Sequence, residues 1–301
     1  VATSGDTGSA VAHAYHRLSG IRVVVLFPRD KVSPLQQKLF TTLHDNVHAV
    51  SIDGDFDDCQ RLAKSAFADR ELSKKRPLVS ANSINVGRLL PQSFYYFHLY
   101  SQLPEDARRT LVVSVPSGNF GNLTAGLLAK RMGLPVERFV AATNVNDVVP
   151  EYLTSGIFRA RASTQTISNA MDVGNPSNFV RIQWLYGHSR QALKKDLVGS
   201  VHTDDDTRAA IRKVYEGHDY LLDPHGAIGY LGALDGQAEE GLESSAVFLG
   251  TAHPAKFKET VDAVIGSSIL LPDALLSVEE KPERIDELDV DYPALKNYLA
   301  S

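Results

Sequence analysis

A glycine-rich segment near the middle of the chain has the clearest chemical potential. It runs from Ser114 to Asn122 (SVPSGNFGN), after the apolar residues 111–113. Unpaired N–H groups at the start of a helix bind anions, phosphate above all. Glycine keeps side chains away from such an anion and permits positive φ angles, so Gly118 and Gly121 predict a phosphate site. Further donors are expected from Ser117, Asn119 and Asn122. The alternative is an ordinary strand-to-helix turn.

Three more predicted strand-to-helix turns contain polar or small residues. They are residues 3–8, 81–88 and 251–254. Ligands of open α/β sheets bind beyond the carboxyl ends of the strands. We therefore expect all four turns to face one cleft.

The turn at residues 3–8 is a second candidate anion site. Backbone N–H groups and the hydroxyls of Ser4 and Thr7 would hold a substrate carboxylate beside Gly5 and Asp6. The alternative is that Ser4 or Asp6 caps a helix. Asp6 weakens an anion site unless its carboxylate points elsewhere.

Two further polar residues and two histidines lie in the remaining turns. Arg88, one helical turn after Asn85, would bind a phosphate or carboxylate with two hydrogen bonds, or else form a surface salt bridge. Thr251 places a hydroxyl at a strand end, where it would meet a ligand or cap a helix. His225 and His253 are expected to be structural hydrogen-bonding residues.

Composition excludes several classes of protein. The 301 residues are 43% hydrophobic with a net charge of -5 and no basic stripe, which argues against nucleic acid as a partner. Apolar runs such as 21–27 are too short to span a membrane, and no signal peptide opens the chain. Cys59 is the only cysteine and is expected to be buried and inert. The pattern indicates a cytoplasmic α/β protein, and no metal site is predicted.

Strand-like and helix-like patterns alternate, which predicts parallel sheets flanked by helices. The expected helices are 7–18, 34–43, 57–72, 87–102, 123–131, 178–186 (capped by Asn178), 204–216 and 227–234, with one starting at Pro254 and more after 278. The expected strands are 22–27, 47–52, 78–81, 110–115, 138–142 and 246–250. Tyr95, Tyr96 and Trp184 are expected to be packing residues.

The polar break at Pro104 suggests a boundary between two domains. Residues 1–103 would be the remainder of an N-terminal α/β domain. Residues 104–301 would form a C-terminal ligand-binding α/β domain, with a helical and loop insertion around 145–200.

Taken together and in order, seven segments resemble threonine synthase, in the longer type found in many bacteria and in fungi. The segments are 2–10 (ATSGDTGSA), 82–85 (NSIN), Arg88, Gln92, 117–122 (SGNFGN), 172–178 (DVGNPSN) and 251–257 (TAHPAKF). Any one of these motifs is weak evidence, but the ordered set across nearly the whole chain is specific.

The resemblance implies a fold-type-II enzyme, like the tryptophan synthase β chain, that uses pyridoxal 5'-phosphate (PLP). The family converts O-phospho-L-homoserine and water to L-threonine and phosphate. By position, the cofactor phosphate would be held by the loop Ser117, Gly118, Asn119, Phe120, Gly121 and Asn122. The hydroxyl of Thr251 would meet the pyridine nitrogen. The substrate would be bound by Ser4, Gly5, Asp6 and Thr7 and, near its phosphate, by Asn85 and Arg88.

One element of the family pattern is missing. The family's Schiff-base lysine lies in a Phe-Lys-Asp motif upstream of the turn at residues 4–8, and the chain contains no such motif. Lys258, in Phe-Lys-Glu, lies in a predicted C-terminal helix and is rejected. We therefore expect an N-terminally truncated chain that is inactive alone, from an active parent. Truncation of the protein and omission of the segment from the sequence are both open explanations.

Two other interpretations remain. Another fold-type-II PLP enzyme, such as a threonine dehydratase or cysteine synthase, shares the loop and the strand-end hydroxyl, although the segments 82–85 and 172–178 argue against it. A non-catalytic module that binds phosphorylated ligands would also lack the lysine. A nicotinamide dehydrogenase is a weaker alternative, because the motif Gly-x-Gly-x-x-Gly is absent from the loop at Ser117. The oligomeric state is not predicted.

Overall fold

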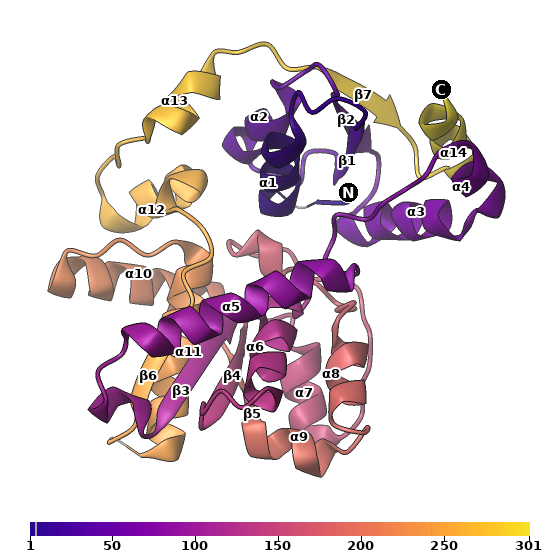
Figure 1. Cartoon of the computed structure of the whole chain (residues 1–301). Helices are drawn as coiled ribbons and strands as arrows, with labels where there is room; N and C mark the ends of the chain where they lie inside the picture. The colour runs from indigo at the N-terminus through magenta and orange to yellow at the C-terminus, as the bar shows by residue number, and fades with distance from the viewer. Residues whose placement is uncertain (4, 242) are drawn as a thin grey trace. The chain divides into compact units, whose positions relative to one another are not determined.

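The computed structural model describes residues 1–3, 5–241 and 243–301 (Figure 1). The chain divides into two compact units. Unit 1 is Val1–Asn82 with Leu270–Ser301, and unit 2 is Ser83–Ile269. The domain division at residues 103 and 104 stays a prediction. Within the described residues, no helix is long and apolar enough to cross a membrane.

Unit 1 contains a three-stranded parallel sheet in the order β1 (Val23–Pro28), β2 (Val47–Ile52), β7 (Ile285–Leu288). Ala2 adds an isolated parallel bridge to Leu26 of β1. The helices of this unit are α1 (Asp6–Tyr15), α2 (Pro34–Thr41), α3 (Phe56–Ala68), α4 (Arg70–Lys75), α13 (Asp273–Glu279) and α14 (Tyr292–Ala300). Apolar side chains of β1 and β2 fill two small cores in this unit.

Two predictions for unit 1 are wrong, and one strand was not predicted. Residues 78–81 form no strand, and the side chain of Asn82 instead pairs with the backbone N–H and C=O of Ala2. The helix expected over 57–72 is broken at Asp69, whose carboxylate caps α4 by accepting from the N–H groups of Glu71 and Leu72. The tail contains a strand, β7, which at four residues is too short to show a clear hydrophobic period.

Cys59 matches its prediction. It is fully buried in α3, and burial raises the pKa of its thiol to about 12. Because the thiolate is the reactive form, this cysteine is inert.

Unit 2 is built on a four-stranded parallel sheet in the order β5-β4-β3-β6. These strands are β3 (Leu111–Pro116), β4 (Arg138–Thr143), β5 (Leu197–Val201) and β6 (Ser245–Phe248). Every residue of β3 is buried, as expected for a strand covered on both faces. The remaining elements are α5 (Val86–Gln102), η1 (Asp106–Arg108), α6 (Gly121–Arg131), α7 (Val148–Ser155), η2 (Asn169–Met171), α8 (Phe179–Leu185), α9 (Arg190–Asp196), α10 (Asp204–His218), α11 (Pro224–Glu240), η3 (Pro254–Phe257) and α12 (Lys258–Ile265).

Helix α11 lies directly on one face of this sheet (Figure 1). A Cβ on Gly232 would lie 2.7 Å from Ser114 Oγ, and one on Gly236 would lie 2.5 Å from a methyl of Val140. Two glycines on one side of the helix therefore permit the close approach. Ser114 Oγ is buried there with no hydrogen-bond partner among the described residues.

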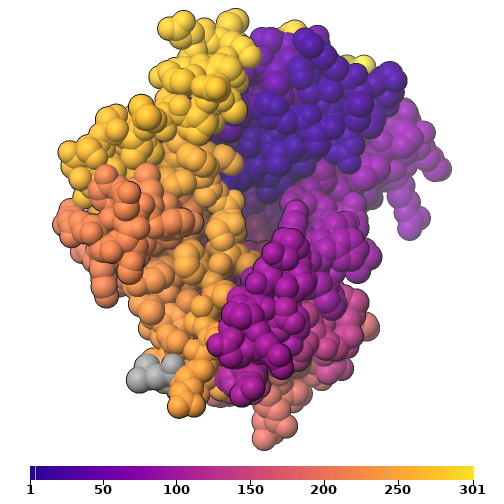
Figure 2. All heavy atoms as spheres, turned by 60° about the vertical axis from the view of Figure 1, so that its left-hand side comes forward, coloured from indigo at the N-terminus to yellow at the C-terminus, as the bar shows by residue number. Residues whose placement is uncertain are grey.

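The other face is covered by helices α5 to α9 around the main core of the unit. Tyr96 of α5 is buried in this core, as predicted. Tyr95 and Trp184 are 68% and 74% exposed, so their prediction as packing residues is wrong. Figure 2 shows α5 at the surface in purple to magenta. Phe94 and Phe97 of this helix are exposed as well. The helical period of α5 alone does not show which side is buried.

Candidate functional site

The candidate site lies where β3 and β6 end. The two strands are parallel neighbours, with Ser114 opposite Phe248, so both carboxyl ends reach the same edge of the sheet. The N–H of Leu249 donates to Ser114 O at 3.1 Å, and the N–H of Ser117 donates to Ala142 O at 3.0 Å. The loop 117–122 and the turn 249–253 therefore leave adjacent positions of one edge, as the sequence predicts.

The loop turns at Phe120, not at its glycines. Phe120 has φ 59°, in the left-handed region, and its ring is 2% exposed in the core. The expectation that Gly118 and Gly121 supply positive φ is wrong. They are required by close contacts, since a Cβ on Gly118 would lie 2.5 Å from Ala170 O and one on Gly121 would lie 2.9 Å from Ser83 Cβ. The buried ring holds a backbone geometry that costs about 1–3 kcal/mol.

The backbone of this loop forms an anion cradle. Helix α6 begins at Gly121 without a side-chain cap. Within the part of the chain that the structure describes, the N–H groups of residues 118–122 meet no acceptor. Converging N–H groups at the positive end of a helix form a phosphate site. The loop therefore fits the phosphate of a bound cofactor.

Side chains of the loop mostly bond to the loop itself. The Ser117 hydroxyl donates to Asn122 Oδ1 at 2.9 Å, and Asn122 Nδ2 donates to Pro116 O at 2.9 Å. Asn119 Oδ1 accepts from the N–H and the hydroxyl of Ser177, both at 3.2 Å. Ser117 and Asn122 thus stabilise the loop, while the amide nitrogen of Asn119 makes no bond to the described residues.

Asn178 joins the loop to the segment before α5. It is fully buried, its Nδ2 donates to Ser83 Oγ at 2.8 Å, and its N–H donates to Asn119 O at 3.3 Å. Asn178 is the N-cap residue of α8, as predicted, but its side chain makes no capping hydrogen bond. Arg181 binds the Ser83 carbonyl at 3.1 Å and also contacts Ile84 O.

Two predicted substrate residues follow this clamped segment. Asn85 caps α5, because its Oδ1 accepts from the N–H of Gly87 at 3.0 Å. Arg88 is half-buried in the first turn of α5, and burial lowers the pKa of its guanidinium without removing its charge. Unit 2 thus brings the segment 83–88 beside the loop 117–122.

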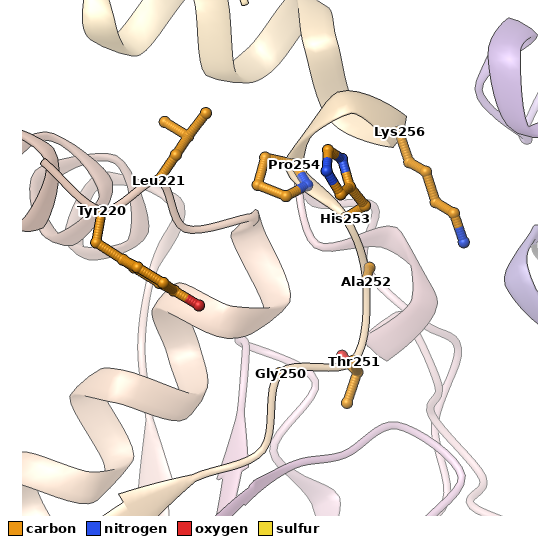
Figure 3. A pocket seen from close by; sticks show the side chains of 8 residues that line it. All are labelled: Tyr220, Leu221, Gly250, Thr251, Ala252, His253, Pro254 and Lys256. Atoms are coloured by element: carbon orange, nitrogen blue, oxygen red, sulfur yellow. The ribbon is translucent and has the colours of Figure 1, made fainter. Parts of the chain in front are cut away.

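The turn after β6 lines a pocket of about 600 Å³. Its walls are Tyr220, Leu221, Gly250, Thr251, Ala252, His253, Pro254 and Lys256. Figure 3 shows the Tyr220 side chain extending towards the turn at Thr251, while the Lys256 side chain points away from Tyr220. His253 caps η3 by accepting from the N–H of Ala255 at 3.1 Å, which is a structural role as predicted. Thr251 is therefore not the cap, and its exposed side chain belongs to the pocket.

Sequence reasoning missed a buried polar cluster behind the loop. The carboxylate of Asp172 accepts from Asn144 Nδ2 at 2.9 Å, Asn146 Nδ2 at 3.2 Å and Thr166 Oγ1 at 2.7 Å. Despite these bonds, burial raises the pKa of Asp172 to about 6. Two asparagines directly after β4, at the same sheet edge, are the signal that would have predicted the cluster.

The turn at residues 3–8 belongs to unit 1. Ser4 lies outside the described residues. Thr3, not Asp6, caps this end of α1, because its hydroxyl accepts from the N–H groups of Gly5 at 2.9 Å and Gly8 at 2.8 Å. Asp6 Oδ1 accepts from Gln36 Nε2 at 3.2 Å, so its carboxylate is engaged by α2. Thr7 follows in the first turn of α1.

Lys258 is committed to a local ion pair. Its amino group contacts Asp262 at 2.5 Å, Ser268 Oγ at 2.5 Å and Ile269 O at 3.0 Å. An ammonium held by a carboxylate is not a free amine, which agrees with its rejection as the Schiff-base lysine.

The fold and the site define a class of enzyme. A family model described as "Pyridoxal-phosphate dependent enzyme" matches residues 1–251, and one described as "Threonine synthase, C-terminal" matches residues 226–299. The fold therefore belongs to fold-type-II PLP enzymes. A maize serine racemase, at 20% identity and a TM-score of 0.62, shares the fold alone.

Individual relatives narrow the class. Threonine synthase of Serratia marcescens is 52% identical over 298 residues, which are 99% of this chain and 68% of the relative; the Escherichia coli enzyme is 50% identical with the same coverage. The crystal structure of threonine synthase from Escherichia coli matches with a TM-score of 0.94 at 49% identity, over 99% of this chain and 68% of that chain. A PLP-bound threonine synthase from Brucella melitensis matches with a TM-score of 0.85 at 36% identity, over 99% and 69%. The chain belongs to the threonine synthase family.

Proposed function

We propose that this chain binds PLP on the loop 117–122 as part of a protein that converts O-phospho-L-homoserine and water to L-threonine and phosphate. The observation that carries the proposal is the cradle of N–H groups at the end of β3, one strand away from the Thr251 turn. Membership of the threonine synthase family supports the substrate. The cytoplasmic location stays a prediction.

When bound, PLP supplies an electron sink for the negative charge that develops at the substrate α-carbon. The loop 117–122 binds its phosphate through backbone N–H groups, which anchors the cofactor without consuming a charged side chain. The hydroxyl of Thr251 would donate one hydrogen bond to the pyridine nitrogen. Unlike a carboxylate, a hydroxyl does not favour the protonated ring, so the ring stays largely neutral.

The substrate residues are those that the resemblance implies. Asn85 and Arg88 would bind the substrate phosphate, since Arg88 is a permanent cation next to the loop. Ser4, Gly5, Asp6 and Thr7 would hold the carboxylate. The bond between Gln36 and Asp6 supports this role, because it directs the Asp6 carboxylate towards α2. The overall reaction removes protons from the α- and β-carbons, expels the γ-phosphate, adds the hydroxyl of water at the β-carbon and returns protons to the γ- and α-carbons.

The test is an assay of the protein expressed from its complete gene. Release of phosphate and formation of threonine are measured from O-phospho-L-homoserine, with and without added PLP. We expect both products in equal amounts and only with PLP. Ammonia from threonine, without phosphate release, would instead indicate a dehydratase. PLP binding with neither reaction would indicate a non-catalytic module.

A further inference from the structure

His225 makes two directional hydrogen bonds inside unit 2. It lies in the first turn of α11 and is 3% exposed. Its Nδ1 is 3.1 Å from Asp223 Oδ1, and its Nε2 accepts from the N–H of Ala170 at 3.2 Å. Because an ionised carboxylate only accepts and a backbone N–H only donates, Nδ1 carries the proton and Nε2 is the acceptor. The neighbours of the ring therefore select one neutral tautomer.

The bond to Ala170 reaches the anion cradle. Ala170 lies in η2, and its carbonyl oxygen would be 2.5 Å from a Cβ on Gly118, with Met171 Cα at 2.9 Å. The backbone of η2 therefore packs directly against the loop 117–122. A displacement of η2 would move the surface on which Gly118 rests.

The same ring also contacts the turn after β6. The rings of His225 and Phe257 meet edge to face, with centroids 4.9 Å apart and an interplanar angle of 64°. Phe257 is 7% exposed and ends η3, six residues after Thr251. One imidazole thus contacts the two segments, η2 and η3, that adjoin the loop and the turn that would bind the cofactor.

We propose that His225 is a positioning residue for the cofactor site. It fixes the loop 117–122 through Ala170 and the Thr251 turn through Phe257, and so sets the spacing between the protein groups that would bind the phosphate and the pyridine nitrogen of PLP. The proposal rests on the proposed function, because it takes these two segments as the PLP site. Asp223 orients the ring through its bond to Nδ1.

Two substitutions separate the two hydrogen bonds. His225→Gln can place an amide oxygen near the position of Nε2 and so keep an acceptor for Ala170. His225→Asn keeps a donor near the position of Nδ1 for Asp223, but leaves the buried N–H of Ala170 without an acceptor. His98→Asn, on the exposed side of α5, is the control.

The measurements are hydrogen exchange of the Ala170 amide without cofactor and PLP affinity by fluorescence titration, with thermal unfolding recorded for each variant. In His225→Asn we expect roughly tenfold faster exchange and roughly tenfold weaker PLP binding, because one buried donor is left unsatisfied. His225→Gln should stay within about threefold of wild type in both measurements, and the control should be unchanged. If both variants lose the same affinity in proportion to their stability, or neither changes, His225 does not position the site.

A second variant tests the other contact. Phe257→Leu keeps apolar volume but removes the ring, so PLP affinity should fall while the Ala170 amide stays protected. Unchanged PLP affinity would show that the ring contact between His225 and Phe257 does not position the site. The Phe257→Leu variant gives this result even if His225→Asn does not fold. The exchange measurement needs no cofactor. Failure of the wild-type protein to bind PLP would therefore overturn the proposed function, while normal exchange in His225→Asn would overturn the bond to Ala170.

Discussion

The Tyr96 hydroxyl donates a hydrogen bond of 2.6 Å to the carbonyl oxygen of Asn122. Tyr96 is 1% exposed. A Cβ on Gly126 would lie 2.7 Å from Tyr96 Cζ, so the ring packs closely against this glycine. The bond therefore links the middle of α5 to the first turn of α6. This buried aromatic side chain therefore stabilises the anion cradle at the start of α6.

Tyr96→Phe should loosen this support while preserving the packing of the ring. We expect a loss of about 1 kcal/mol in the free energy of unfolding, because one buried carbonyl loses a partner. PLP affinity should fall by a few fold. Urea unfolding and PLP titration are the measurements. Tyr95→Phe, at an exposed position of the same helix, is the control and should change neither.

Gly118→Ala should damage the cradle more severely. The new Cβ would lie 2.5 Å from Ala170 O, so the loop or η2 must shift. We expect a loss of about 1–3 kcal/mol of stability and roughly tenfold weaker PLP binding, since overpacking displaces the backbone that holds the phosphate. Chemical unfolding and titration with PLP measure both.

Gly217→Ala is the matched control for that substitution. Gly217 lies in α10, and a Cβ there would meet nothing within 4 Å. Replacing a helical glycine should increase stability by up to about 1 kcal/mol and leave PLP binding unchanged. Equal PLP affinity in the Gly118 and Gly217 variants would contradict the assignment of the loop.

Thr251→Asp should change the electronic state of the cofactor rather than its anchoring. A carboxylate at the pyridine nitrogen favours the protonated ring, whereas a hydroxyl does not. We expect a shifted absorbance maximum of the bound PLP and at least about tenfold slower phosphate release. Thr251→Ser retains the hydroxyl and should keep the wild-type spectrum. A wild-type spectrum in Thr251→Asp would show that this residue does not meet the ring nitrogen.

The sequence predicts the sheet-edge loop well because its evidence is local. A buried run ending at Pro116, followed by Gly118 and Gly121, predicts a strand, a turn and a helix start in that order. Most strands of both units were placed within a residue or two for the same reason. The strands β5 and β7 were not predicted, and the pairing of β7 with β2 depends on contacts across more than 200 residues.

Long-range contacts explain the rest of the difference between prediction and structure. The sequence does not reveal that position 118 requires glycine because the carbonyl of Ala170 lies against it. The bond between Ala170 and His225 joins residues 55 apart, and no periodic pattern encodes it. Similarly, Asn178 has the residue type of a helix cap, yet Ser83 takes its side chain. Tertiary packing decided between two local roles in each case.

Asp172 should give the protein a pH-dependent stability. Its folded pKa of about 6 lies above its ordinary value, because burial penalises the carboxylate more than its hydrogen bonds favour it. Between pH 4 and about 6 the folded state binds more protons at this group than the unfolded state does. The contribution of Asp172 to stability is therefore full at low pH and is lost as the pH rises through about 6.

Asp172→Asn removes this titration while retaining an acceptor for the cluster of Asn144 and Thr166. Comparing urea unfolding of the wild type and the variant from pH 4 to 8 isolates the contribution of one group. The wild type should lose stability relative to Asp172→Asn as pH rises, by at most about 3 kcal/mol over the range, and the difference should level off above pH 7. A difference that is constant with pH, or that changes in the opposite direction, would mean that the hydrogen bonds from Asn144 and Thr166 outweigh burial.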